Sequence, residues 1–169
     1  LGYFLHKHVP RTVFLPPIYR DELEYLYAGM EVERTFVGTN GDLPAEGESQ
    51  GKMDTFVSAQ VARISIHRIG SDFEIFILRL ENEARDKGTE IFQVWLPLTS
   101  TFVSAATHIL RMHDYFIGGL LPDRFGGDAL LMQKVKCETD WGSIALYSER
   151  AKRIADIVRS DQKKTKCNP

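Results

Sequence analysis

The sequence predicts an α/β fold, and three observations support this prediction. Strand-like and helix-like segments alternate along most of the 169 residues. Residues 101–135 have the pattern of a helix, a strand, a Pro/Gly turn and a second strand that returns antiparallel. An amphipathic segment over 144–160 follows. We therefore expect a mixed, largely parallel sheet with helices on both faces, a closing antiparallel hairpin and an extra C-terminal helix.

Composition narrows the class of protein. Hydrophobic residues make up 43% and charged residues 26% of the chain, which is typical of a soluble globular domain. A net charge of −2 gives no general attraction to nucleic acid or anionic lipid, so neither is expected as a partner. No apolar run reaches the ~20 residues of a membrane helix. Cys137 and Cys167 lack CxxC spacing, which argues against disulfide or zinc frameworks and favours a cytoplasmic protein.

The two ends of the chain predict a piece of a longer protein. The sequence begins LGYFLHKHVP, without methionine or a signal-peptide pattern, and ends in the polar DQKKTKCNP. We expect residues 1–11 to lead in from an upstream domain and residues 12–135 to form the main domain. Residues 136–169 would hold a connector, the C-terminal helix and a polar tail. A start codon directly upstream of Leu1 would contradict this expectation.

The first half predicts short elements around a loop. Residues 12–15 form a β-prone run that ends at Pro16-Pro17, and a helix follows. Its predicted buried face contains Tyr19, Leu23, Leu26, Tyr27 and Met30. A strand is expected over 32–37 and a loop over 38–54. Residues 55–69 predict one long strand or two short ones, with a break near Ala59.

The second half carries stronger signals. Ser71 and Glu74 predict a capping box that opens a helix, which ends at Lys87-Gly88. Residues 91–96 form a nearly continuous apolar run, as expected of a strand covered on both faces. A helix starting at Ser100 or Thr101 runs to about His113. The strands 115–121 and 128–135 then flank a turn.

The order of elements from Ala62 to Val135 resembles the GNAT superfamily of N-acetyltransferases. The segments VFLPPIYRDELEYLYAGMEVERTF and YFIGGLLPDRFGGDALLMQKV resemble a narrower group. These are the GNAT-like domains at the C-terminal end of bacterial proteins that begin with an anti-sigma-factor-type, histidine-kinase-like ATPase domain. The resemblance implies a GNAT-like fold, acetyl-CoA or another acyl-CoA as cofactor, and an ATPase-like upstream domain of the same chain as partner.

Two departures from the family pattern argue against catalysis. Active members hold the pyrophosphate of acetyl-CoA on an R/Q-x-x-G-x-G/A turn, which corresponds here to residues 67–72, HRIGSD, with one glycine. Asp72 and Glu74 would repel a phosphate at the helix start, which Arg68 partly offsets. Many active members also carry a tyrosine general acid in L-Y-x-x-x-G-F. The matching positions are Leu110 and Asp114, and leucine cannot donate a proton.

These considerations predict a binding cleft and leave three functions open. The predicted lining of the cleft is Ile66, His67, Arg68, Ile69, Gly70, Ser71, Val94, Leu96 and Leu98. The first function is a regulatory or ligand-binding domain that is catalytically degenerate. The alternatives are an active acyl-CoA-dependent N-acyltransferase, and a protein-interaction or dimerisation module that uses the C-terminal helix and the edge at residues 120–122. No catalytic residue is identified.

Other chemical groups receive ordinary structural interpretations. His108 and His113 are five residues apart, which does not align two metal ligands on a helix, so no metal site is expected. His113 is expected to cap the end of its helix, and Cys137 to be buried or inert. Gly118-Gly119 within a strand indicates a bulge or a close approach, by a packed neighbour rather than a ligand.

Overall fold

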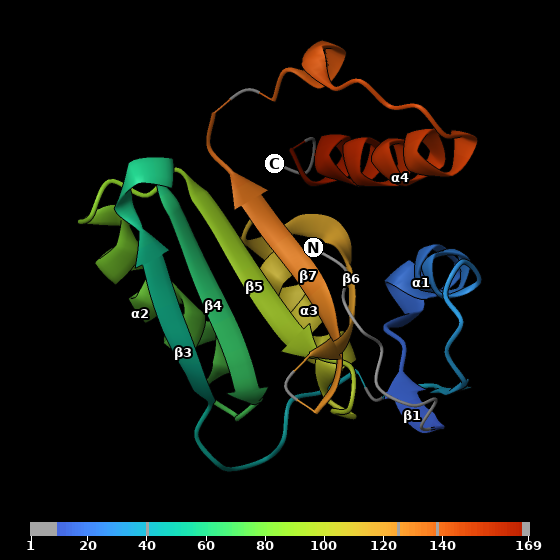
Figure 1. Ribbon diagram of the computed structural model, residues 1–169. Helices are drawn as coiled ribbons and strands as arrows, with labels where there is room; N and C mark the ends of the chain where they lie inside the picture. Colours follow the sequence, from blue (N-terminus) through green and yellow to red (C-terminus); the bar gives the residue numbers. More distant parts are fainter. Residues whose placement is uncertain (1–9, 40, 125, 138, 167–169) are drawn as a thin grey trace.

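The computed structural model describes residues 10–39, 41–124, 126–137 and 139–166. Residues 1–9 of the predicted lead-in, and Cys167, lie outside the described residues. The helices and strands are β1 (Arg11–Phe14), α1 (Arg20–Tyr27), β2 (Arg34–Val37), β3 (Gln50–Phe56), β4 (Val61–Arg68), α2 (Phe73–Arg85), β5 (Ile91–Pro97), α3 (Val103–Met112), β6 (Phe116–Arg124), β7 (Gly127–Val135) and α4 (Glu149–Lys166). Figure 1 shows their arrangement.

The strands form two sheets. The main sheet has five strands in the order β3-β4-β5-β7-β6, and β1 pairs with β2 in a separate two-stranded sheet. Within the main sheet, β4 and β5 are parallel and every other pair is antiparallel. The predicted mixed α/β class, the closing hairpin and the C-terminal helix are confirmed. The expectation of a largely parallel sheet is wrong, because β3 forms a hairpin with β4 and β7 inserts antiparallel between β5 and β6.

One strand in the first half of the chain was not predicted from the sequence. The predicted loop over 38–54 ends at Ser49, and β3 begins at Gln50. A glycine and alternating charges in Gln50–Phe56 conceal this strand, which pairs with β4 over seven positions. The predicted break near Ala59 is confirmed, because a turn of 3-10 helix over Val57–Ala59 separates β3 from β4 and Gln60 is left-handed.

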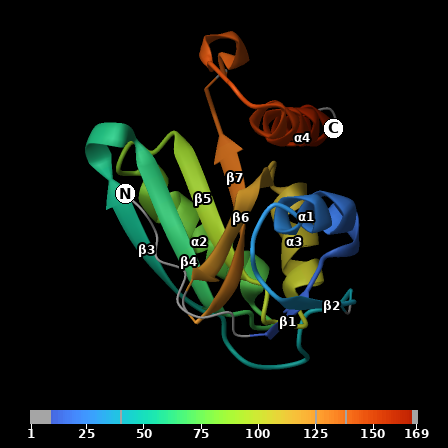
Figure 2. The same ribbon diagram turned by 45° about the vertical axis from the view of Figure 1, so that its right-hand side comes forward.

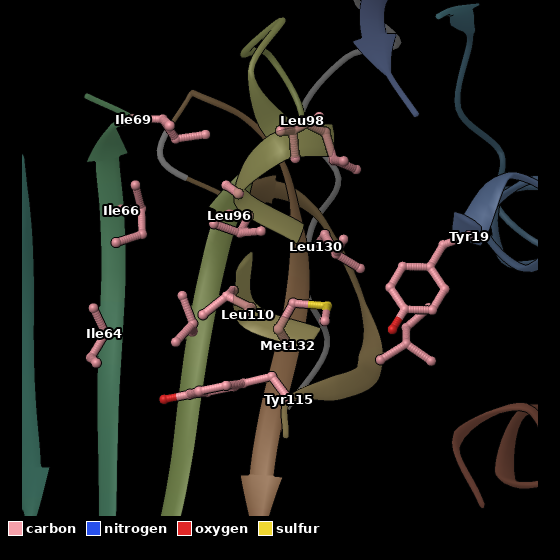
Figure 3. Packing of buried hydrophobic residues seen from close by; sticks show 14 of the residues in the cluster. Tyr19, Ile64, Ile66, Ile69, Leu96, Leu98, Leu110, Tyr115, Leu130 and Met132 are labelled. Atoms are coloured by element: carbon pink, nitrogen blue, oxygen red, sulfur yellow. The ribbon is translucent and has the colours of Figure 1, made fainter. Parts of the chain in front are cut away.

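The main core lies between the sheet and the helices α2 and α3, which Figures 1 and 2 show on the same side of the sheet. Figure 3 shows how side chains from β4, β5 and β7 gather with those of α3 and the segment before β6. The fully buried members of this cluster include Ile64, Val94, Leu96, Leu110, Tyr115, Leu130 and Met132. Burying this much apolar surface is the main source of the fold's stability.

The strand β5 is buried on one face only. Its even-numbered residues Phe92, Val94 and Leu96 are fully buried, while its odd-numbered residues are half-exposed. The expectation that both faces are covered is therefore wrong. The apolar run misleads because Trp95 and Pro97 are apolar although they point away from the core.

The helix starts differ from the predicted caps. α2 begins after Asp72, and no side chain caps it. The Ser71 hydroxyl donates instead to the Gly47 carbonyl at 3.1 Å, so the predicted capping box is wrong. α4 starts at Glu149 and runs to Lys166, whereas Ile144 and Tyr147 are exposed residues before it.

No helix among the described residues is long and apolar enough to cross a membrane.

The helix α4 covers the outer edge of β6. The Asp161 carboxylate accepts a hydrogen bond from the Ile117 backbone N–H at 2.8 Å and from the Tyr19 hydroxyl at 2.5 Å. Arg111 of α3 donates to the same carboxylate at 2.6 Å. Asp161 is buried, with 7% of its surface exposed. One carboxylate therefore joins the C-terminal helix to the sheet edge, to α3 and to the turn before α1.

Close packing, rather than a ligand, explains the glycine pair Gly118-Gly119 in β6. A Cβ on Gly118 would lie 2.8 Å from Leu131 Cγ, and Gly119 has a φ of +149°. The register of β6 on β7 shifts between Ile117 and Gly119. These glycines therefore serve a bulge and close cross-strand packing.

Candidate functional site

The site is built where β4 and β5 separate. Their parallel ladder ends at the pair Ser65 and Trp95, although β4 continues to Arg68 and β5 to Pro97. The carboxyl ends of the two strands therefore diverge. In α/β sheets, a crevice outside the carboxyl ends of neighbouring parallel strands is a common place for a ligand.

Two cavities open at this divergence. The larger, of about 430 Å³, is lined by Pro44, Glu46, Gly47, His67, Arg68, Ile69, Gly70, Pro97, Thr99, Ser100 and Phe102. The smaller, of about 220 Å³, is lined by Ile66, His67, Trp95, Pro97, Thr99, Arg124, Gly127, Asp128 and Ala129. His67, Pro97 and Thr99 belong to both, so the cavities adjoin around the end of β5. We call the two together the cleft.

The structure divides the predicted lining into three groups. His67, Arg68, Ile69 and Gly70 line the larger cavity, and Ile66 lines the smaller. The Ser71 hydroxyl bonds to the Gly47 carbonyl beside the larger cavity. Val94, Leu96 and Leu98 line neither cavity, because their side chains are fully buried in the core.

Sequence reasoning missed Trp95, Pro97 and Thr99. Side chains alternate along a strand, so when Val94 and Leu96 face the core, Trp95 and Pro97 must face the other way. The sequence allows two arrangements of β5, in which either its even-numbered or its odd-numbered residues face the core. The apolar character of the run hides that choice, because a continuous apolar run predicts burial on both faces.

The loop between β4 and α2 is bonded to a segment of the same chain. This segment, Gly47–Ser49, is called the strap below. The Gly70 N–H donates to Ser49 Oγ at 2.9 Å, and the Ser71 N–H donates to the Gly47 carbonyl at 2.9 Å. Arg68 Nε donates to the Glu48 carbonyl at 2.9 Å. The two backbone donors of Gly70 and Ser71 are therefore already satisfied within the chain.

The strap backbone also lies where a side chain of Gly70 would point. A Cβ on Gly70 would lie 2.4 Å from the Glu48 carbonyl carbon and from Ser49 N. Because glycine has no side chain, the strap backbone can occupy the space beside Gly70 where a side chain would otherwise lie. This packing explains the single glycine of the loop.

Acidic side chains lie beside the strap, in addition to Arg68. Asp72 Oδ1 accepts a hydrogen bond from the Ser49 N–H at 2.6 Å. This bond, together with a bond to the Ser49 side chain, holds the pKa of Asp72 below its ordinary value. Glu46 lines the neighbouring cavity. Because the amides of Gly70 and Ser71 are bonded within the chain, they are not free to hold a pyrophosphate, and the loop departs from the acyl-CoA seat that the resemblance implies.

The back of the smaller cavity holds a buried, fully engaged carboxylate. Asp128 is 1% exposed and accepts hydrogen bonds from Tyr27 Oη at 2.7 Å, Arg34 Nε at 2.6 Å and the Asp123 N–H at 3.0 Å. Burial alone would raise the pKa of Asp128, but the bonds from Arg34, Asp123 and Tyr27 lower it overall. A carboxylate held by donors from three residues is a poor general base.

The nearby tyrosines do not offer an acid either. Burial, followed by the charge and hydrogen bond of Asp128, raises the pKa of Tyr27 far above its usual range. Leu110, at the family's tyrosine position, is fully buried. Asp114, at the family's glycine position, has a φ of +66°, which is the backbone region that glycine favours. The backbone at Asp114 thus has a conformation that glycine favours, and the Leu110 side chain has no proton to donate.

The remaining candidate groups lie away from the cleft. His113 follows the end of α3 and its Nε2 atom lies 2.8 Å from Glu74 Oε1, whereas His108 is exposed. Within the described residues, no three His, Cys, Asp or Glu side chains come together as metal ligands would. Cys137 was expected to be buried or inert; it is exposed, so the first alternative is wrong and the second stays a prediction. Cys137 lies in the connector after β7.

Comparisons with known proteins add little. No protein-family model matches the chain, and no curated protein matches it. A similar solved structure is yncA from Salmonella typhimurium, a proposed acetyltransferase with its cofactor acetyl-CoA. The sequences are 16% identical, the match covers 60% of this chain and 62% of that one, and the TM-score is 0.39. A similarity this low does not identify an activity, so the residues of the cleft have to indicate the function.

Proposed function

We propose that this chain is a GNAT-like domain that has lost acyl transfer and acts as a regulatory domain by binding a small ligand in the cleft. One observation carries the proposal. The strap occupies the backbone donors of Gly70 and Ser71, while the cleft beside them stays open. The domain thus retains a place for a ligand at the strand ends but not the seat for a pyrophosphate.

The walls of the larger cavity indicate the kind of ligand. His67 and Arg68 end β4, and Thr99 and Ser100 supply hydroxyl groups from the segment after β5. Ile69, Pro97 and Phe102 supply apolar surface. Its volume of about 430 Å³ lies within the range of small-molecule sites. These groups suit a small metabolite with carboxylate or carbonyl oxygens that accept hydrogen bonds.

Thermal unfolding in the presence of ligands tests the proposal. Small carboxylates and acetyl-CoA are each added at millimolar concentration to the wild-type chain. We expect at least one carboxylate to raise the midpoint in a dose-dependent way, because a ligand of the folded state stabilises it by mass action. We expect no rise with acetyl-CoA, and no release of thiol when amines are added with it.

Two matched variants locate the site. His67→Ala removes a side chain shared by both cavities and should abolish the carboxylate-dependent rise. His108→Ala removes an exposed histidine from α3 and should leave it intact. Thiol release with acetyl-CoA would instead support the active acyltransferase, and the absence of any ligand effect would support the interaction module.

The narrower resemblance suggests what the domain regulates. We propose that an ATPase-like domain precedes this chain and responds to the occupied cleft. Measuring the ATPase rate of the longer protein with and without the carboxylate checks this step. A rate that does not change while the cleft fills would contradict the regulatory role and leave ligand binding intact.

A further inference from the structure

The two edges of the main sheet are treated differently. The outer edge of β6 is covered by α4, whose Asp161 accepts the Ile117 N–H. The outer edge of β3 lies at the opposite end of the sheet (Figures 1 and 2). Among the described residues, no strand pairs with that side of β3. The strands β1 and β2 pair with each other in the separate sheet. An open strand edge presents backbone N–H and C=O groups that can extend a sheet.

The charges of β3 are arranged so that the strand complements itself. Lys52 and Asp54 are two residues apart, point to the same face of the sheet, and form a salt bridge of 2.7 Å. Both side chains are substantially exposed, at 68% and 44%. Lys52 alone would discourage edge pairing, as lysine does at many sheet edges. Asp54 changes this, because it supplies the opposite charge at the position that an antiparallel copy would bring to Lys52.

We propose that a second copy of this chain docks on β3, antiparallel and about a two-fold axis at Met53. In this register Lys52 lies opposite the partner's Asp54, and Asp54 lies opposite the partner's Lys52. Opposite charges directly across a strand pair are stabilising, and like charges are destabilising. The two five-stranded sheets then form one continuous ten-stranded sheet across the dimer, which satisfies the backbone groups of both edges.

The residues at the ends of β3 are compatible with this register. Phe56 is 43% exposed and would lie opposite the partner's Gln50 on the face that carries the charges. Gly51 would lie opposite the partner's Thr55 on the other face, where glycine adds no bulk. A pair of seven-residue strands buries less area than a permanent dimer needs, so the dimer should be reversible and depend on concentration. The inference does not depend on the proposed ligand.

Sedimentation of the 169-residue chain over a range of concentrations tests the proposal. The wild type should shift from monomer to dimer as concentration rises. Lys52→Asp brings two carboxylates face to face at both charged pairs of the dimer, and Asp54→Lys brings two ammonium groups face to face there. Each variant alone should dimerise at least about tenfold more weakly than the wild type.

Mixing the two variants gives the decisive result. An equimolar mixture restores opposite charges at all four positions, so it should form a heterodimer with an affinity within about threefold of the wild type. The double variant Lys52→Asp/Asp54→Lys should dimerise with itself for the same reason, and thermal midpoints check that each chain is folded. A wild type that remains monomeric, single variants that dimerise normally, or a mixture that does not recover would each overturn the proposal.

Discussion

At the scale of single residues, Asp161 is a buried contact between α4 and the rest of the fold. It accepts hydrogen bonds from Tyr19, Arg111 and the Ile117 N–H, and all three donors are buried or half-buried. Asp161→Ala would leave the Arg111 charge and the Ile117 N–H without this acceptor. We expect a loss of about 3–5 kcal/mol in the free energy of unfolding, measured by urea denaturation.

Asp156→Ala is the matched control for that substitution. Asp156 lies on the same helix and is exposed, so its removal should change stability by no more than about 0.5 kcal/mol. Equal effects of the two substitutions would show that the polar cluster around Asp161 does not hold the helix.

Asp128 should make stability depend on pH. Burial raises its pKa, but hydrogen bonds from Arg34, Asp123 and Tyr27 outweigh this and keep the pKa below its ordinary value. A depressed carboxyl pKa contributes stability above the unfolded pKa, near 3.9, and loses it as pH falls through the folded value. Asp128→Asn should therefore cost about 3 kcal/mol at pH 7.

Urea denaturation of wild type and Asp128→Asn at several pH values checks the sign. The difference between the two proteins should stay constant above about pH 5 and shrink steadily in more acid solution. The other carboxylates are common to both proteins and cancel in the difference. A difference that is unchanged at acid pH would mean that the Asp128 charge is not what stabilises the fold.

At the scale of elements, the loop between β4 and α2 and the strap act as one unit. Gly70→Ala would place a Cβ 2.4 Å from the strap backbone, which cannot yield as the end of a flexible side chain can. We expect a loss of about 1–3 kcal/mol in unfolding free energy. Faster hydrogen exchange of the Ser71 N–H should accompany it, because its acceptor, the Gly47 carbonyl, is displaced.

Gly38→Ala provides the comparison, because a Cβ on Gly38 would meet nothing within 4 Å. Its unfolding free energy and the exchange of Ser71 should match those of the wild type. If Gly70→Ala behaves like Gly38→Ala, the strap does not pack on Gly70 as described.

The helices could be predicted from sequence patterns, but the edge strand β3 could not. Helical periodicity identified α1, α2 and α3, because a buried stripe of side chains repeats strongly along each helix. It could not identify β3, whose glycine and alternating charges give an exposed edge strand the composition of a loop. The sequence also placed the start of α2 at the wrong residue. Ser71 is a residue type that often caps helices, but its hydroxyl bonds to Gly47 in the strap, 24 residues away in sequence.

At the scale of the whole molecule, local sequence predicts which residues end β4 but not which distant segment they contact. The end of β4 at His67 and Arg68, followed by Ile69 and Gly70, is predicted from local sequence, and these four residues line the larger cavity. The occupation of the loop by Gly47–Ser49 arises from a contact between segments distant in sequence, and no local pattern encodes it. The proposed function rests on this contact, so the structure is needed to find it.

The central claim is that the amides of Gly70 and Ser71 belong to the strap and not to a pyrophosphate. Following these two amide resonances by ¹H–¹⁵N NMR while acetyl-CoA is added tests it most directly. We expect both amides to exchange slowly with solvent before the addition, and neither resonance to move up to millimolar acetyl-CoA. Saturable shifts of both resonances would contradict the claim, because they would show that these donors can leave the strap and bind the cofactor.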